Sequence, residues 1–145
     1  MCFGTFDVLH LGHLDYFRQA KQYGEHLIVV IARDKTKERQ NKEILFNEEE
    51  RLTLLKELKI VDEIVLGDTE DHFKVIKENM PDVICLGYDH VVKEDFLYSK
   101  LNEFGLSTKI VRARPFKDDK HKSSIIRDLV MSKEWKQNHT LELPD

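Results

Sequence analysis

Short apolar runs alternate with longer amphipathic stretches along most of the chain. The apolar runs, which predict strands, cover residues 2–6, 26–32, 63–66, 82–86 and 108–111. The amphipathic stretches, which predict helices, cover residues 14–23, 48–58, 72–79, 93–104 and 123–131. Runs such as IVVIA and DVICLG are apolar on both faces, as parallel strands are when helices cover both sides of a sheet. The pattern predicts an α/β fold with a single Rossmann-like doubly wound parallel sheet and helices on both faces.

Local signals support these boundaries. Asn47 begins a sequence typical of a helix capping box, while Gly24 and Gly105 fall where helices are expected to stop. The segments 33–46 and 112–122 are polar and charge-rich, and we interpret both as connections. In an open α/β sheet, loops that follow strands border the ligand crevice, so these two segments are expected near a binding site.

Length and composition favour one domain. With 145 residues, 41% hydrophobic and 34% charged, the chain is long enough to bury one core. We assign residues 1–131 to that domain and residues 132–145 to a C-terminal tail. No apolar run approaches the roughly 20 residues of a membrane helix and no signal peptide is evident, so we expect a cytoplasmic protein without a membrane partner. Cys2 and Cys85 lie in strand-like runs without metal-binding spacing, which favours buried, reduced thiols.

The net charge of −4 argues against a broad nucleic-acid-binding face. A small anionic ligand needs only a few local donors, and basic residues gather in segments 33–42 and 112–122. The net charge therefore disfavours a nucleic-acid partner and leaves a small anionic ligand possible, because local charge matters more than the total.

The segment of residues 4–13, GTFDVLHLGH, leads from the first predicted strand into the first helix. The N-terminus of a helix presents unpaired N–H groups and a positive dipole end, so it stabilises a phosphate. His10 and His13, spaced three apart, add directed donors on the same side of the turn. Gly12 between them is expected to let the backbone approach a ligand closely. Taken singly, each histidine is more often a surface or capping residue; the combined string in this context favours function.

This string resembles the H-x-G-H signature of the nucleotidyltransferase superfamily, which includes cytidylyltransferases, archaeal-type FAD synthases and related adenylyltransferases. The resemblance covers nearly the whole chain, and archaeal FAD synthases look most similar. Its second expected motif is a hydroxyl-rich turn that opens a late helix, which Lys122-Ser123-Ser124 followed by Arg127 resembles. Lys122 stands where many relatives have a hydroxyl residue, so a cation would replace that donor.

The resemblance implies roles for residues elsewhere in the chain. The residues expected to bind the nucleotide are Gly4, Thr5, Phe6, Asp7, His10, Gly12, His13, Arg51, Gly87, Asp89, Lys122, Ser123, Ser124 and Arg127. The residues expected to contact the acceptor are Asp7, Tyr88 and Phe116, with Phe46 and Phe96 as further candidates to stack on a ring. The expected catalytic residues are His10, His13, Ser123 and Lys42, which we prefer over Lys35 and Lys37. Asp7 is also expected to orient a histidine or to contact a metal through water.

The implied reaction joins a phosphorylated acceptor to the α-phosphate of a nucleoside triphosphate and releases pyrophosphate, with ATP and FMN giving FAD as the preferred pair. Mg²⁺ is expected to arrive with the nucleotide rather than to bind protein ligands directly. Glycerol 3-phosphate with CTP and a sugar 1-phosphate with ATP are the alternatives, and a non-catalytic ATP-binding regulator is the alternative from another class. We expect a homodimer, with Trp135 of the tail as a candidate to cover the partner.

Overall fold

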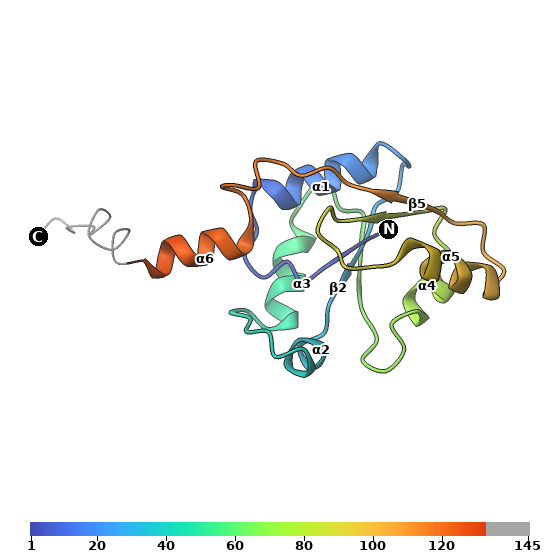
Figure 1. Cartoon of the computed structure of the whole chain (residues 1–145), viewed down its shortest axis with the longest axis horizontal. Coiled ribbons are helices and arrows are strands. Elements are labelled where there is room, and N and C mark those ends of the chain that lie inside the picture. The colour runs from blue at the N-terminus through green and yellow to red at the C-terminus, as the bar shows by residue number, and fades with distance from the viewer. Residues whose placement is uncertain (133–145) are drawn as a thin grey trace, which may run out of the picture.

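The computed structural model describes residues 1–132 and contains one parallel sheet (Figure 1). Its strands are β1 (Cys2–Gly4), β2 (Ile28–Ile31), β3 (Glu63–Leu66), β4 (Val83–Leu86) and β5 (Lys109–Arg112). They lie in the order β3-β2-β1-β4-β5, and every pairing is parallel. The chain runs from β1 to one side and later returns to the other, so the ends of β1 and β4 form the topological switch point where ligands bind in open α/β sheets.

Two pairs of helices cover the two faces of the sheet, as predicted. Helices α1 (Leu11–Lys21) and α3 (Glu48–Lys56) bury side chains such as Phe17 in one core layer. Helices α4 (Lys74–Asn79) and α5 (Glu94–Glu103) bury theirs in the other layer. The strands between them are buried from both sides, which confirms the doubly wound arrangement and explains why their sequences do not alternate.

Helix α2 (Asp34–Arg39) corrects the prediction that residues 33–46 form a connection without an element. It buries no side chain, so it lacks the apolar periodicity on which the sequence prediction depends. Asp34 in its first turn and basic residues in its last turn suit the helix dipole. The helix places its polar side chains beside the carboxyl end of the sheet.

The helix boundaries follow their capping groups. Asn47 and Glu50 form the capping box that the sequence indicates, and Gly105 follows α5 with a φ of 71°. Helix α1 begins three residues earlier than predicted because His10 acts as its N-cap. It ends at Lys21, before the predicted stop at Gly24.

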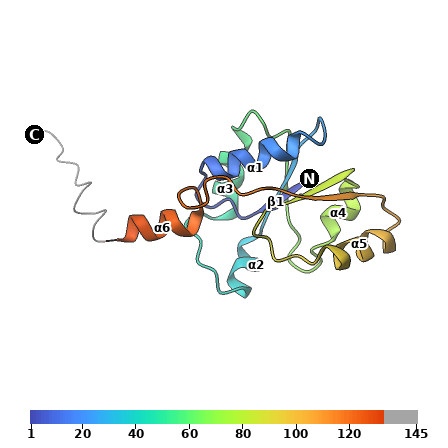
Figure 2. The same cartoon turned by 45° about the horizontal axis from the view of Figure 1, so that its top comes forward.

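Helix α6 (Ser123–Met131) extends away from the body of the molecule (Figure 2). The connection that follows β5 runs back along α1 and then leads into α6 (Figure 1). Residues 133–145, with the role expected for Trp135, lie outside the described residues. Within residues 1–132, no helix is long and apolar enough to cross a membrane. The cysteines Cys2 and Cys85 are buried free thiols on the adjacent strands β1 and β4, as expected.

Candidate active site

A cavity of about 1170 Å³ opens at the carboxyl ends of the central strands. The turn after β1, helix α2 and its following loop, the segment after β4 and the start of α6 all contribute to its wall. Of the residues considered for the site, the cavity is lined by Gly4, Thr5, Phe6, Asp7, His10, Gly12, His13, Lys37, Lys42, Gly87, Tyr88, Asp89, Phe96, Phe116, Lys122, Ser123, Ser124 and Arg127. The fold thus brings together motifs that are far apart in the sequence.

The turn before α1 fixes the orientation of both histidines. Nδ1 of His10 accepts a hydrogen bond from the backbone N–H of Gly12 at 3.0 Å, and Nδ1 of His13 accepts one from that of His10 at 3.3 Å. The two rings stack with centroids 3.8 Å apart. A neutral imidazole that accepts at Nδ1 carries its proton on Nε2, so each ring offers an Nε2–H donor.

Burial keeps these histidines neutral. Desolvation, followed by the neighbouring His10, lowers the pKa of His13 to about 3. Desolvation and then the nearby His121 lower the pKa of His10. At neutral pH both rings are therefore directed neutral donors. They suit the stabilisation of phosphate oxygens better than general acid catalysis.

The serine turn lies directly against the histidine turn. Oγ of Ser123 is 3.2 Å from Nε2 of His10, although 113 positions separate the two residues. Gly12 makes this approach possible, because a Cβ at that position would lie 2.5 Å from the carbonyl oxygen of His121. The structure therefore gives Gly12 another reason than close approach to a ligand: it admits the chain that leads into α6.

The side chain of Phe6 packs against His13 and so helps to hold the histidine pair in place. Its backbone is left-handed, with a φ of 55°, and its buried ring packs edge-on to His13 at a centroid distance of 5.3 Å. A Cβ at Gly4 would lie 2.6 Å from this ring, so Gly4 accommodates Phe6. These two residues shape the turn on which His13 is held.

The carboxylate of Asp7 is occupied by hydrogen bonds to other parts of the protein. Its carboxylate accepts hydrogen bonds from the backbone N–H groups of Leu45 and Phe46 and from Nη2 of Arg127, each at 2.8 Å. The side chain is only 3% exposed. In place of the expected contact with a histidine, Asp7 therefore joins the loop after α2 to helix α6.

Arg51 lies outside the cavity wall, so the structure does not bring it together with the other residues expected to bind the nucleotide. Its side chain is 0% exposed, and its guanidinium donates to the carbonyl oxygens of Phe46, Thr5 and Ala32 and to the carboxylate of Asp34. A planar group with several fixed donors suits this task. Arg51 thus ties the ends of β1 and β2 to α3 beneath the site.

Two more residues that line the cavity need comment: Lys37, a loop lysine over which Lys42 is preferred from the sequence, and His90, which has no role assigned from the sequence. Lys37 is on α2, and burial followed by the charge of Lys42 lowers its pKa. His90 accepts at Nδ1 from the N–H of Gly87 at 3.0 Å, which repeats the three-residue spacing between His10 and His13. That repeated spacing is a sequence signal for His90, whereas the polar sequence around Lys37 does not distinguish it from its neighbours.

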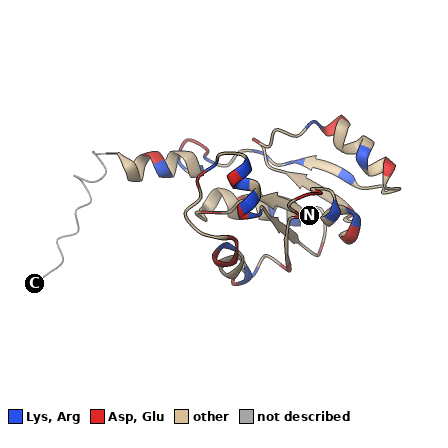
Figure 3. Cartoon of the chain, turned by 90° about the horizontal axis from the view of Figure 1, so that it is seen from below, with Lys and Arg blue, Asp and Glu red and all other residues tan. Residues whose placement is uncertain are grey.

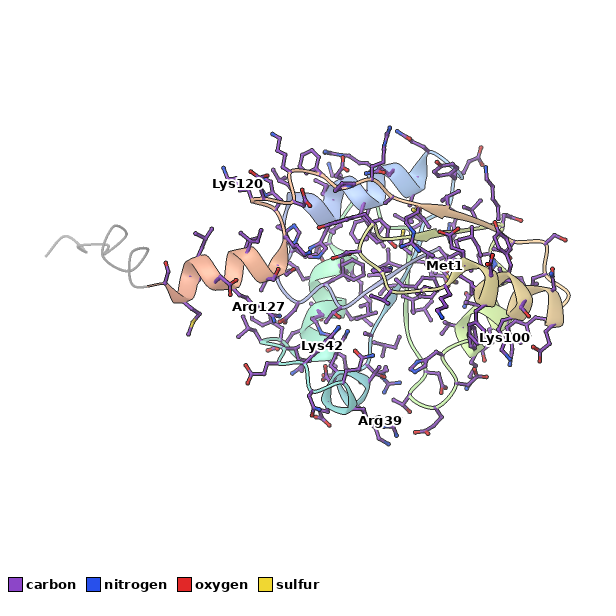
Figure 4. All side chains as sticks on the ribbon, in the orientation of Figure 1. Met1, Arg39, Lys42, Lys100, Lys120 and Arg127 are labelled. Carbon is purple, nitrogen blue, oxygen red and sulfur yellow. The ribbon has the colours of Figure 1, made fainter. Side chains whose placement is uncertain are left out.

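Charge at the site is local. Figure 3 shows that basic and acidic residues are mixed over the outer helices. Around the cavity, Lys122 lies 3.8 Å from Asp89 and 5.7 Å from the centre of the Tyr88 ring, so these three predicted residues meet. Arg127 at the base of α6 and Lys42 on the loop after α2 lie on the same side of the molecule (Figure 4).

Hydrogen-bond donors gather at the N-termini of α1 and α6 beside the switch point, an arrangement typical of nucleotide-binding α/β proteins. The family model described as cytidylyltransferase-like matches residues 1–129. The chain belongs to this family of nucleotidyltransferases, which confirms the resemblance found in the sequence.

The curated relatives that this chain resembles include proteins named FAD synthase. The one from Thermoplasma volcanium is 43% identical over 131 residues, which cover 90% of this chain and 92% of the relative. The one from Methanohalophilus mahii is 50% identical over 109 residues, covering 75% and 76%. A solved structure described as the lipopolysaccharide core biosynthesis protein from Thermoplasma volcanium has a TM-score of 0.78 and 44% identity. The match covers 81% of this chain and 96% of the chain in that structure.

Proposed function

We propose that this protein is a FAD synthase, which transfers AMP from ATP to the phosphate of FMN and releases pyrophosphate. The observation that best supports nucleotidyl transfer is the contact between His10 and Ser123. It brings the N-termini of α1 and α6 together at one cavity, where both can donate hydrogen bonds to phosphate groups. The choice of FMN is supported by the relatives named FAD synthase at 43% and 50% identity.

In the proposed reaction, a phosphate oxygen of FMN attacks the α-phosphorus of ATP in line. The bond from the α-phosphorus to the oxygen that bridges to the β-phosphate breaks, and pyrophosphate leaves with those electrons. The chain supplies position and charge rather than a nucleophile. Nε2–H of His10 and of His13 donates to the oxygens on which negative charge grows, and Ser123, Ser124 and the helix N-termini add further donors.

Cations complete the charge balance. Lys42 and Lys37 line the cavity from the α2 side, Lys122 and Arg127 from the α6 side. Residues 1–132 contain no group of three or more histidine, cysteine, aspartate or glutamate residues arranged to hold a metal. Mg²⁺ that keeps phosphate and water oxygens in its shell needs no such group, so we propose that it enters with ATP and neutralises charge on the triphosphate.

The acceptor end of the cavity suits an aromatic ring. Phe73, the N-cap residue of α4, and Phe96, in the first turn of α5, line the cavity and pack edge-on with centroids 6.1 Å apart. Phe96 is 54% exposed, so part of its ring is accessible from the solvent. Tyr88 and Phe116, the residues expected from the sequence, line the cavity nearer to α6. We propose that the flavin ring lies against Phe96, and Tyr88 and Phe116 remain predicted acceptor contacts.

Pyrophosphate release is the decisive test. Purified protein with Mg²⁺ is given ATP or CTP in combination with FMN, glycerol 3-phosphate or a sugar 1-phosphate. We expect release with ATP and FMN, together with FAD as the product. Release only with CTP and glycerol 3-phosphate, or only with ATP and a sugar 1-phosphate, would show that the acceptor is that molecule and not FMN. ATP binding without release in any pair would favour the non-catalytic regulator.

We also propose that the protein is a homodimer. The outer part of α6 exposes Leu129, Val130 and Met131, and exposed Leu45 and Phe46 lie near its base. Exposed apolar side chains on a helix that extends from the body are stabilised when a second copy covers them. The expected mass by light scattering is that of two chains, and Leu129→Glu should yield one; a monomeric wild type would contradict the proposal.

A further inference from the structure

Three segments far apart in the sequence meet at the carboxylate of Asp7. The turn after β1 carries Asp7 itself, residues 45–46 end the loop that contains Lys42, and Arg127 belongs to α6. One carboxylate oxygen accepts from the N–H of Phe46, and the other accepts from the N–H of Leu45 and from Nη2 of Arg127. Arg127 and Lys42 lie on the same side of the molecule, as Figure 4 shows.

The backbone conformation of Phe6, just before Asp7, directs this carboxylate toward its three hydrogen-bond donors. Phe6 adopts a φ of 55°, a conformation that is unfavourable for a bulky side chain and persists only when packing enforces it. The packing comes from its ring, which fits over Gly4 and against His13. The same strained residue therefore supports His13 on one side and directs Asp7 on the other.

The contact partners of Asp7 are themselves next to phosphate-binding groups. Leu45 is three positions after Lys42, and Arg127 is one helical turn after Ser123. Nε of Arg127 is buried without a hydrogen-bond partner among the described residues, so its Nη2 contact with Asp7 is a main polar restraint on the guanidinium. Loss of the carboxylate would release both the loop and the base of α6.

We propose that Asp7 is a positioning residue that clamps the Lys42 loop and helix α6 onto the histidine turn. It acts through these two segments, because its side chain is 3% exposed and already accepts three hydrogen bonds. The proposal rests on the proposed function, since that function makes the clamped segments the two walls of the triphosphate site. ATP affinity is then set by a residue that is almost inaccessible to ATP.

Asp7→Asn tests the clamp by direct titration of the folded protein with ATP and Mg²⁺. The amide replaces one accepting oxygen by an NH₂ group that faces other donors, and the ion pair with Arg127 is lost. We expect the Kd for ATP to rise about fivefold or more. Asp128→Asn removes the same charge from an exposed acid on α6 and should leave the Kd unchanged. A Kd for folded Asp7→Asn equal to that of the wild type would overturn the proposal.

Trypsin provides a second readout that needs no ligand. Arg127→Gln changes a residue on α6, and Asp7 is the group that links Arg127 to the loop ending at residues 45–46. Cleavage after Lys42 should therefore accelerate several-fold in Arg127→Gln as well as in Asp7→Asn, and remain at the wild-type rate in Asp128→Asn. If Asp7→Asn does not fold, Arg127→Gln still decides: unchanged cleavage after Lys42 would refute the clamp.

These measurements separate the clamp from the acceptor. ATP titration and proteolysis involve no FMN, so absence of FAD formation by the wild type would reject the proposed acceptor and leave the clamp result standing. Conversely, an active wild type with unchanged ATP affinity and proteolysis in the variants would reject the clamp alone.

Discussion

His10 and His13 owe their chemistry to the backbone that carries them. Each ring accepts a backbone N–H at Nδ1, so the turn selects the tautomer that presents Nε2–H to the cavity. Burial lowers the pKa of both rings, which leaves them as neutral donors at neutral pH. A short local sequence thus produces two oriented donors without a separate orienting carboxylate.

His13→Ala removes one of these donors and should lower kcat for pyrophosphate release by about 10² or more, because a donor that stabilises transition-state charge contributes several kcal/mol. The fold should persist, which circular dichroism can verify. His26→Ala alters an exposed histidine outside the cavity wall and should retain full turnover. Unchanged kcat in His13→Ala would remove the histidine pair from the mechanism.

The low pKa of His13 also predicts how stability depends on pH. The folded-state pKa of about 3 lies below the ordinary value of 6.5, so between these values the unfolded chain binds a proton that the folded chain does not. Stability is therefore complete above the ordinary pKa and decreases as the pH falls toward the folded value. We expect Tm to fall over this range more steeply for the wild type than for His13→Asn, measured by calorimetry; parallel curves would contradict the burial argument.

At the level of elements, sequence patterns predicted what depends on local periodicity. The bounds of β3 and α6 agree with the prediction, because apolar runs and a hydroxyl-rich start are local signals. Helix α2 was overlooked because it buries nothing, and the early start of α1 because a histidine acts as its cap. The contact between Asp7 and Arg127 spans 120 positions, so no local pattern predicts it.

Arg51 illustrates how α3 is attached to the sheet. Its buried guanidinium forms four hydrogen bonds, to the residues that follow β1 and β2, to Phe46 just before α3, and to Asp34 on α2. Arg51→Lys keeps the charge but loses the fork, leaving buried carbonyls unpaired, and should reduce the free energy of unfolding by about 3 kcal/mol. Chemical denaturation measures this, with the exposed Arg18→Lys on α1 as control. A variant as stable as the wild type would argue that these bonds are dispensable.

At the level of the whole molecule, the cavity spans the switch point and has two chemically different ends. The end formed by the histidine turn and α6 offers hydrogen-bond donors and cations, whereas the starts of α4 and α5 offer aromatic rings. Because different elements build the two ends, substitutions at each should affect different substrates. The proposed function assigns ATP to the first end and the flavin ring of FMN to the second.

Phe96→Ala tests this division. Stacking of an aromatic ligand on an exposed ring contributes on the order of 1 kcal/mol, so KM for FMN should rise about tenfold at most. KM for ATP should stay near the wild-type value, because the triphosphate donors are on other elements. Tyr23→Ala removes an exposed aromatic side chain outside the cavity wall and controls for a general loss of aromatic surface. If Phe96→Ala raised KM for ATP and left that for FMN unchanged, the two substrates would have to exchange ends, and the aromatic residues at α4 and α5 would bind the adenine instead.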